Sequence, residues 1–297
     1  MNGVLIIDKP AGMTSHDVVN RVRRILHERS VGHLGTLDPM ATGVLPLVIG
    51  NFTRLAQFYT RAEKTYEGTI RFGFPTDTYD AEGEPTAAAK QITLDHAEVE
   101  SLAASFRGVI EQMPPPFSAK KIHGVPAYKL ARRHKEVVLE AVQVEIKEFE
   151  ILAVEADRAR FRARVASGTY LRSVAHDMGL RLGCGAHLEQ LRRTVVAEFA
   201  MQDAFTIDQL AAMAASGEEF FVHPRKLLPE LPSVMADEAN VARIRSGRPV
   251  NLPELSRARQ VKVFHGQTEL IAIATRVAGT LFHAKLVLCG EHTSVAG

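Results

Sequence analysis

The stretch GHLGTLDPMATGVLPLVIG, residues 32–50, carries one acidic side chain, Asp38, among glycine, threonine and aliphatic residues. Its second part, GVLPLVIG (43–50), is apolar and bounded by glycines, which predicts a buried strand or the wall beneath a site. A carboxylate in apolar surroundings costs free energy unless it is paired or functional. Asp38 is therefore the first candidate for a catalytic residue.

Two other interpretations of this stretch need only ordinary turn chemistry or phosphate binding. An Asp followed by Pro is typical of a turn whose acid caps the next segment. The glycines at 32, 35 and 43 do not have the spacing of a phosphate-binding loop, and no lysine follows them. They would instead let the backbone approach a large ligand closely. The stretch holds no second acid for a glycosidase pair, although a partner could come from elsewhere in the chain.

Composition places few limits on function. The chain has 297 residues, of which 46% are hydrophobic, so it can form one large domain or a large and a small one. A net charge of +2 neither demands nor excludes a nucleic-acid partner. Cys184 and Cys289 are far apart and form no zinc-type cluster with histidine, so we expect free thiols, a reducing cytoplasmic location and no metal site. The N-terminus does not fit a signal peptide, and no run of about 18 apolar residues predicts a membrane segment.

The first hundred residues predict alternating strands and helices. A strand at 3–9 should end at Pro10, and a helix should follow over 14–28, capped by Thr14 or Ser15 with Asp17 at its positive end. Residues 52–72 indicate a helix and then a strand with Tyr66 on its apolar side. A further helix is predicted over 93–106, capped by Thr93 or Asp95.

The segment around residues 113–140 differs in character from its surroundings. Three consecutive prolines are followed by six lysines and arginines, at 120, 121, 129, 132, 133 and 135. Such a segment resists packing into a core and predicts a projecting arm. Either a solvated linker or a nucleic-acid contact explains the charge.

The second half predicts strands of period two up to Val165, a break at Ser167-Gly168 and a helix over 169–183 ended by Gly183. Prolines at 224, 229 and 232 predict a linker. Short strands with glycine turns follow from Ser233 onward, which indicates a small β-rich unit.

Five blocks of this sequence resemble the motifs of the TruB-type tRNA pseudouridine synthases, in the order of that family. GHLGTLDPMATGVLPL (32–47) resembles the catalytic motif and DKPAGMTSHDVVNRVRR (8–24) the N-terminal one. KTYEGTIRFGFPTDTYDAEG (64–83) resembles the tyrosine motif, and SGTYLRSVAHDMGLRLGCGAHLEQLRR (167–193) the arginine motif. PPPFSAKKIHGVPAYKLAR (114–132) is similar to the RNA-binding insertion, but the following RHKEVVLE departs from the family pattern.

The resemblance implies an α/β (α+β) fold with a mixed, mainly antiparallel central sheet and flanking helices. It implies a catalytic domain over 1–232, with an RNA-binding insertion at about 113–140, and a small PUA-like β-rich RNA-binding domain over 233–297. The implied reaction is isomerisation of the uridine at position 55, in the T-loop of tRNA, to pseudouridine. That reaction needs no cofactor, metal or energy source.

By motif position, the resemblance implies that Asp38 is the nucleophile acting on a flipped-out base. Arg172 would supply the charge that keeps Asp38 ionised and oriented. Tyr66 would stack on the base and handle the proton at C5. Without the resemblance, a core tyrosine and a surface arginine are the ordinary interpretations.

The resemblance also implies substrate-binding residues. His33 would fill the space that the base vacates, while Tyr170 and Leu191 would line the pocket. Asp80 would belong to a supporting network, and Lys9 would shape the floor of the site. A turn histidine and core residues are the simpler alternatives for His33, Tyr170 and Leu191.

Three other functions stay open at this point. A non-catalytic RNA-binding or RNA-folding protein would need the basic arm but not Asp38. A guide-RNA-dependent relative would carry longer terminal extensions for partner proteins, and a glycoside hydrolase would release free uracil. We expect a cytoplasmic monomer that acts on tRNA without a guide RNA and without a membrane.

Overall fold

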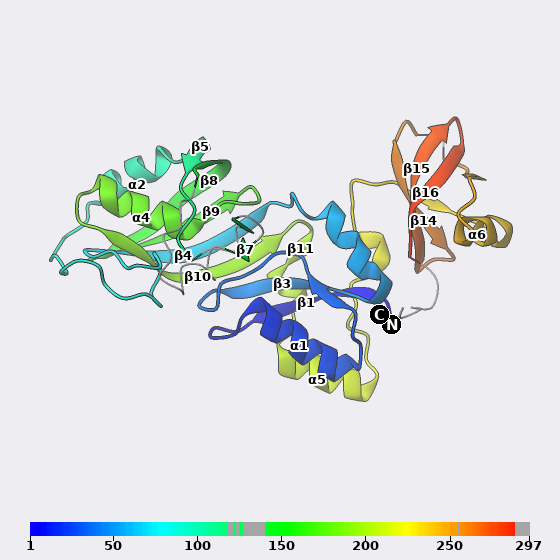
Figure 1. Ribbon diagram of the computed structural model, residues 1–297, viewed down its shortest axis with the longest axis horizontal. Helices are drawn as coiled ribbons and strands as arrows, with labels where there is room; N and C mark the ends of the chain where they lie inside the picture. Colours follow the sequence, from blue (N-terminus) through cyan, green and yellow to red (C-terminus); the bar gives the residue numbers. More distant parts are fainter. Residues whose placement is uncertain (118–120, 123–124, 127–139, 255, 289–297) are drawn as a thin grey trace.

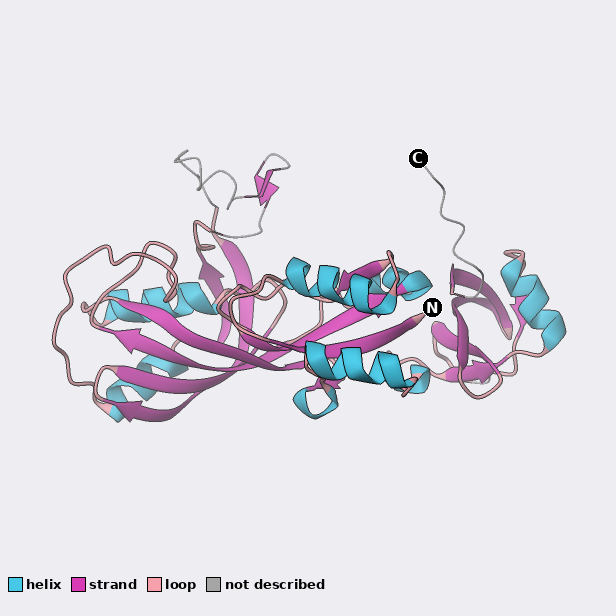
Figure 2. Ribbon diagram, turned by 90° about the horizontal axis from the view of Figure 1, so that it is seen from below, coloured by secondary structure: helices cyan, strands magenta, loops and turns pink. Residues whose placement is uncertain are grey.

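The structure is a computed structural model, which describes residues 1–117, 121–122, 125–126, 140–254 and 256–288. The molecule is elongated, with a C-terminal unit at one end beyond a long main sheet (Figures 1 and 2). Most of the predicted arm at 113–140 lies outside the described residues. The described part of that arm includes a two-stranded hairpin of β6 (Lys121–Ile122) and β7 (Val125–Pro126).

The main sheet has nine strands. Its order is β1 (Gly3–Lys9), β3 (Thr42–Ile49), β10 (Ala186–Val196), β4 (Lys64–Phe72), β9 (Arg158–Val165), β8 (Val142–Glu155) and β5 (Gly108–Gln112), with β2 (Val31–His33) beside β3 and β11 (Phe199–Ala200) beside β10. Among these described strands only β3 and β10 pair in parallel, over Thr42–Gly43 and Arg192–Arg193. The predicted mixed, mainly antiparallel sheet is confirmed.

Helices flank the sheet in two pairs, as predicted. α1 (Ser15–Leu26) and α5 (Ile207–Ser216) contact each other near β1, whereas α2 (His96–Ala104) lies against β8 and α4 (Leu171–Arg181) against β10 (Figure 1). Their buried faces join one apolar core with the strands. Within the part of the chain that the structure describes, no helix is long and apolar enough to cross a membrane.

Side-chain caps fix where α1 and α2 begin. Thr14 caps α1 and forms a capping box with Asp17, and Asp95 caps α2. The predicted helix near residue 52 is a 3₁₀ helix, η1 (Gly50–Phe58). Several elements, including β5, β10 and α5, were not predicted separately.

The C-terminal unit is built on a second sheet. Its strands are β12 (Ser233–Met235), β14 (Gln260–His265), β15 (Glu269–Ala278), β16 (Leu281–Val287) and β13 (Val250–Asn251), and α6 (Glu238–Arg245) packs against them. One face of this sheet encloses its own small core. Other side chains of the sheet, including Phe264 and Leu286, join a cluster with Phe52 and Leu55 of η1. The unit is therefore packed onto the main sheet through apolar contacts.

Candidate active site

Asp38 lies in the loop between β2 and β3, and hydrogen bonds hold that loop at every carbonyl from residue 35 to residue 39. We call residues 35–39 the aspartate loop. Its carbonyls accept bonds from Arg193 (at Gly35 and Thr36), Ser15 (at Leu37), the Ala41 amide (at Asp38), and Lys9 and the Gly12 amide (at Pro39). A loop bound in this way holds its side chain in one orientation, which a catalytic group requires.

Two buried cations provide much of this support. Arg193 is 0% exposed, and its guanidinium donates to the carbonyls of Val44, Thr36 and Gly35 at 2.8, 3.2 and 3.0 Å. Lys9 is equally buried, and its ammonium donates to Pro10, Met13 and Pro39. Burial lowers the pKa of Lys9 to about 8. Lys9 thus lies beneath the loop, and its described contacts are with backbone carbonyls of its own chain.

Arg172 contacts both oxygens of Asp38. Its Nε lies 2.9 Å from Oδ2, and its Nη2 donates to Oδ1 at 3.2 Å. Arg172 is the second residue of α4, directly after the N-cap residue Tyr170 and Leu171. The side chain is only 5% exposed, and it also donates to the carbonyls of Thr78 and Phe117. The predicted ion pair is present, and Arg172 is fixed from several sides.

Asp80 completes the network on the far side of Arg172. Its Oδ2 lies 3.4 Å from Arg172 Nη1, and its Oδ1 accepts hydrogen bonds from the Thr78 hydroxyl (2.6 Å) and the Glu82 amide (3.0 Å). The carboxylate is buried, and it lines one cavity of the described residues, which Asp38 also lines. One guanidinium therefore lies between two carboxylates, which fits the supporting position predicted for Asp80.

Opposing effects act on the charge of Asp38. Burial raises the pKa of this carboxyl above its ordinary value, the Arg172 cation acts against that rise, and the charge of Asp80 adds to it. The side chain nevertheless keeps 36% of its surface exposed. Asp38 thus combines a fixed orientation with an open face toward two cavities.

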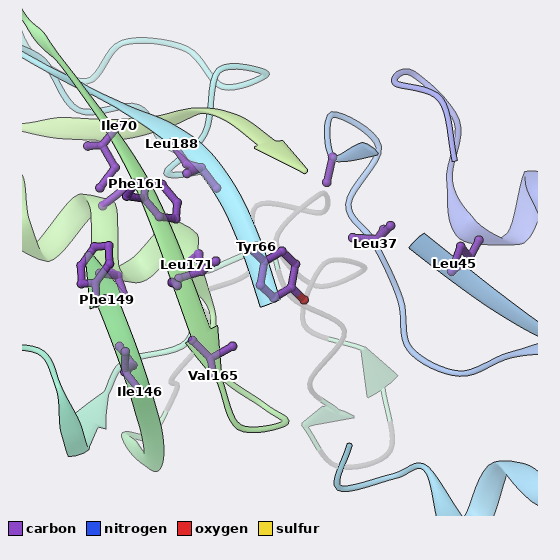
Figure 3. Packing of buried hydrophobic residues seen from close by; sticks show 14 of the residues in the cluster. Leu37, Leu45, Tyr66, Ile70, Ile146, Phe149, Phe161, Val165, Leu171 and Leu188 are labelled. Atoms are coloured by element: carbon purple, nitrogen blue, oxygen red, sulfur yellow. The ribbon is translucent and has the colours of Figure 1, made fainter. Parts of the chain in front are cut away.

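The first of these, which we call the base cavity, has a volume of about 270 Å³. It brings Asp38 and Arg172 together with three predicted residues from distant parts of the sequence, Tyr66, Tyr170 and Leu191. Tyr66 projects from β4 toward the segment that carries Leu37 (Figure 3). Aromatic and aliphatic walls around one carboxylate suit a planar base.

The second cavity, of about 720 Å³, is also lined by Asp38, together with His33, Asp80 and the residues at the start of α1. The Nδ1 atom of His33 accepts the Gly35 amide at 3.3 Å. Burial and the nearby Arg193 lower the pKa of His33, which favours a neutral ring. His33 therefore adjoins the aspartate loop but faces a different space from Tyr66.

Three residues that shape this site were not predicted from the sequence: Arg193, Gln112 and Lys64. Gln112 is buried, and its amide group both donates to the Tyr170 carbonyl (3.0 Å) and accepts the Tyr170 amide (2.8 Å). Lys64 lines the base cavity. Arg193 and Lys64 lie inside quoted motifs, but only the three-dimensional contacts distinguish them from ordinary surface cations.

The described residues include no group of three or more His, Cys, Asp or Glu side chains placed to hold a metal ion. The chemistry that the site offers is that of one oriented carboxylate, a guanidinium and two tyrosines beside a small cavity. Such a set can attack or stabilise an electron-poor carbon and can move a proton.

Comparison with protein families matches two descriptions to adjoining parts of the chain. "TruB family pseudouridylate synthase (N terminal domain)" matches residues 23–171, and "tRNA pseudouridylate synthase B C-terminal domain" matches residues 172–231. The junction between them falls within α4, between Leu171 and Arg172.

Curated relatives align over nearly the whole chain. A protein named tRNA pseudouridine synthase B from Solibacter usitatus is 49% identical over 97% of this chain and 100% of its own length. A protein of the same name from Opitutus terrae is 46% identical over 72% of this chain and 88% of its own length. One from Streptococcus thermophilus is 39% identical over 97% of this chain and 99% of its own length.

Solved structures show the same fold. One, titled as an H/ACA RNP bound to a substrate RNA containing 2'-deoxyuridine, has a TM-score of 0.71 at 24% identity, covering 97% of this chain and 85% of that one. A Cbf5-Nop10-Gar1 complex gives a TM-score of 0.70 at 26% identity with the same coverage. From the two family matches and the full-length relatives, this chain belongs to the TruB family of pseudouridine synthases, enzymes that isomerise uridine in tRNA.

Proposed function

We propose that this enzyme converts the uridine at position 55, in the T-loop of tRNA, to pseudouridine, with Asp38 as the nucleophile. The observation that carries the proposal is the ion pair of Asp38 with Arg172 at the wall of a cavity that also contains Tyr66 and Tyr170. The names of the full-length relatives support tRNA as the substrate.

The reaction breaks the bond between C1′ and N1 of uracil, rotates the base and joins C1′ to C5, after which C5 loses its proton and N1 gains one. No oxidation or reduction occurs. Asp38 acts as an anion at C1′ or at uracil C6, or it stabilises charge while a glycal forms, and Arg172 keeps it ionised and aimed. The three routes share the same requirement for a charged, oriented carboxylate.

The target base must leave its stack before it reaches Asp38. Turning it out costs a few kcal/mol, and stacking on an aromatic ring returns about 1–3 kcal/mol. In this proposal Tyr66, which lines the base cavity, provides that stacking and receives the C5 proton, and Tyr170 and Leu191 complete the wall. We propose that His33, which lines the second cavity, occupies the space that the base leaves in the RNA loop.

We further propose a division of labour between residues 1–232, which carry the site, and residues 233–297, which bind RNA. Exposed arginines in the second part, at 243, 245, 248, 257 and 259, support that division. Phosphate contacts of this kind provide affinity without reading sequence. The enzyme is proposed to act without guide RNA, because the relatives that it matches from end to end are named as tRNA enzymes. We also propose that it acts as a monomer.

The test is to incubate the purified protein with unmodified tRNA transcripts, without cofactor, and to map pseudouridine by chemical labelling and primer extension. The proposal expects one modified position, in the T-loop. Modification at other positions would contradict the proposed specificity. Release of free uracil would instead favour a glycoside hydrolase, and binding without any conversion would favour a non-catalytic RNA-binding role.

A further inference from the structure

Lys64 is the first residue of β4, two positions before Tyr66 on the same face of the strand. It lines the base cavity together with Asp38. Its side chain lies against the aspartate loop: a Cβ atom added at Gly35 would be 3.3 Å from Lys64 Cε and 3.6 Å from Arg193 Nη1. Two cations thus meet at this loop, and only one of them lines the cavity.

The contacts of the two cations differ. Arg193 is fully buried and donates to three backbone carbonyls. Lys64 is half-buried, and its ammonium donates to the Ala62 carbonyl at 2.8 Å. Among the described residues no carboxylate forms an ion pair with Lys64, whereas a lysine ammonium has three donors. Lys64 therefore has donors available for a ligand in the cavity.

Burial and the neighbouring Arg193 lower the pKa of Lys64 to about 8. The protein thus keeps a cation where its charged form is disfavoured. An anion bound in the cavity would offset this cost, because an opposite charge favours the protonated ammonium.

We infer that Lys64 binds a backbone phosphate of the everted nucleotide, an inference that rests on the proposed function. A phosphate is charged before and after the reaction, whereas uracil carries charge only while it is detached. Side chains two residues apart on one strand face are separated by ~7 Å. With the base stacked on Tyr66, a phosphate one sugar away falls within the range of Lys64. A compact, strongly hydrated ammonium suits that ligand.

The test uses Lys64→Met, which keeps the length of the side chain but removes its charge, and Lys64→Arg, which keeps the charge. Lys90→Met is the matched control, because Lys90 is exposed and its ammonium also donates to a single backbone carbonyl, that of Gly183. Single-turnover rates on a T-arm stem-loop at rising enzyme concentration give the half-saturating concentration and the maximal rate. Each is measured at several salt concentrations.

We expect Lys64→Met to raise the half-saturating concentration about tenfold and to reduce the salt slope by about one unit. Lys64→Arg should recover most of the affinity, and Lys90→Met should behave as wild type. Stem-loops with a neutral methylphosphonate on the 5′ or the 3′ side of the target uridine identify the phosphate. On one of these two RNAs, Lys64→Met should cause no further loss of affinity, because the phosphate that Lys64 binds is already neutral.

Unchanged affinity in Lys64→Met would overturn the inference. A tenfold loss of RNA affinity in Lys64→Met that persists on both methylphosphonate RNAs would also overturn it, because Lys64 would then bind neither of the two neutralised phosphates. A fall in maximal rate alone would assign Lys64 to the detached base instead of a phosphate. If the wild-type protein makes no pseudouridine in the stem-loop, it is the proposed function that fails.

Discussion

At the scale of single residues, the central feature is one guanidinium between two carboxylates. Arg172 contacts Asp38 through two atoms and lies 3.4 Å from Asp80. The two acids have different surroundings, because Asp38 opens onto two cavities while Asp80 is 4% exposed and hydrogen-bonded by its own loop. This difference supports the proposal that Asp38 reacts while Asp80 holds Arg172 in place.

Removing the guanidinium should shift the pH dependence of the reaction in a defined direction. Arg172 lowers the pKa of Asp38 against the rise caused by burial, so Arg172→Met should raise that pKa further. A smaller fraction of Asp38 is then ionised at a given pH, and the acid limb of kcat/KM should move to higher pH. The rate near neutrality should fall by about 10²-fold or more. Pseudouridine formation measured from pH 5 to pH 9 checks both effects.

Arg172→Lys should give an intermediate shift, because it keeps a cation but loses the planar fork. Circular dichroism of both variants checks that they fold. A loss of rate with an unmoved acid limb would contradict the assigned effect of Arg172 on Asp38.

Motif resemblance predicted Asp38, Arg172 and Tyr66, and the structure places all three at one cavity. It did not identify Gln112 or Arg193. Their contacts are with backbone atoms of Tyr170 and of the aspartate loop, and backbone contacts leave no pattern in side-chain sequence.

At the scale of elements, the site depends on how strands and loops meet around the aspartate loop. Gly43 is the second residue of β3, the strand after this loop, and it pairs with Arg193 where β3 and β10 run in parallel. Its φ is +102°, and an added Cβ would lie 2.2 Å from the Arg193 carbonyl oxygen. A side chain here would force two backbones apart.

Gly43→Ala should therefore lower the free energy of unfolding by about 3 kcal/mol or more, from strain and overlap together. Gly217→Ala is the control, because Gly217 also has a positive φ (+76°) but no atom within 4 Å of the added Cβ. It should cost only ~1–2 kcal/mol. Urea unfolding of both variants measures the two changes in the free energy of unfolding. Equal losses of stability would show that the close approach of the Arg193 backbone to Gly43 adds nothing to the cost of a side chain there.

Gln112 links β5 to the start of α4 through its two bonds to Tyr170. Gln112→Leu removes both hydrogen bonds between the buried Gln112 side chain and the partly buried backbone of Tyr170, so it should destabilise the protein by about 2 kcal/mol. It should also lower kcat about tenfold, because Arg172 follows Tyr170 by two residues and would lose its exact placement. Thermal unfolding and single-turnover rates measure the two effects.

Gln202→Leu, at an exposed position in η2 (Met201–Asp203), provides the control and should change neither quantity. A stability loss in Gln112→Leu with a normal rate would mean that Gln112 holds the fold but not the site.

Strand β10 shows why part of the fold escaped prediction. It is central in the sheet, yet its register against β4 shifts between Leu188 and Gln190 and again between Arg193 and Val195. Each irregularity interrupts the alternation of period two on which strand prediction rests. The helix α1 was predicted, because its apolar face and its capping residues follow the regular pattern.

At the scale of the whole molecule, the C-terminal unit is joined to the main sheet by apolar packing and by a few polar contacts. Arg54 and Asn51 of η1 donate to the carbonyls of Val287 and Leu288, and the Lys285 ammonium lies 5.6 Å from the centre of the Phe58 ring. A small sheet with its own core and such an interface should unfold together with the rest.

Phe58→Asp should uncouple the two parts, because it places a charge against the apolar cluster that joins them. Calorimetry should show one transition for the wild type and two for the variant, the earlier one several degrees lower. Gln57→Asp changes the exposed neighbouring residue and should keep one transition. Two transitions in the wild type would contradict coupling through this interface.

The central claim is tested most directly by Asp38→Asn, which keeps the shape of the side chain and removes its charge. Single-turnover conversion of T-arm RNA is measured at saturating enzyme beside the wild type and Asp203→Asn, an exposed control. The account predicts loss of nearly all turnover in Asp38→Asn, with RNA affinity retained because phosphate contacts provide most of it. Conversion at the wild-type rate in Asp38→Asn would contradict it.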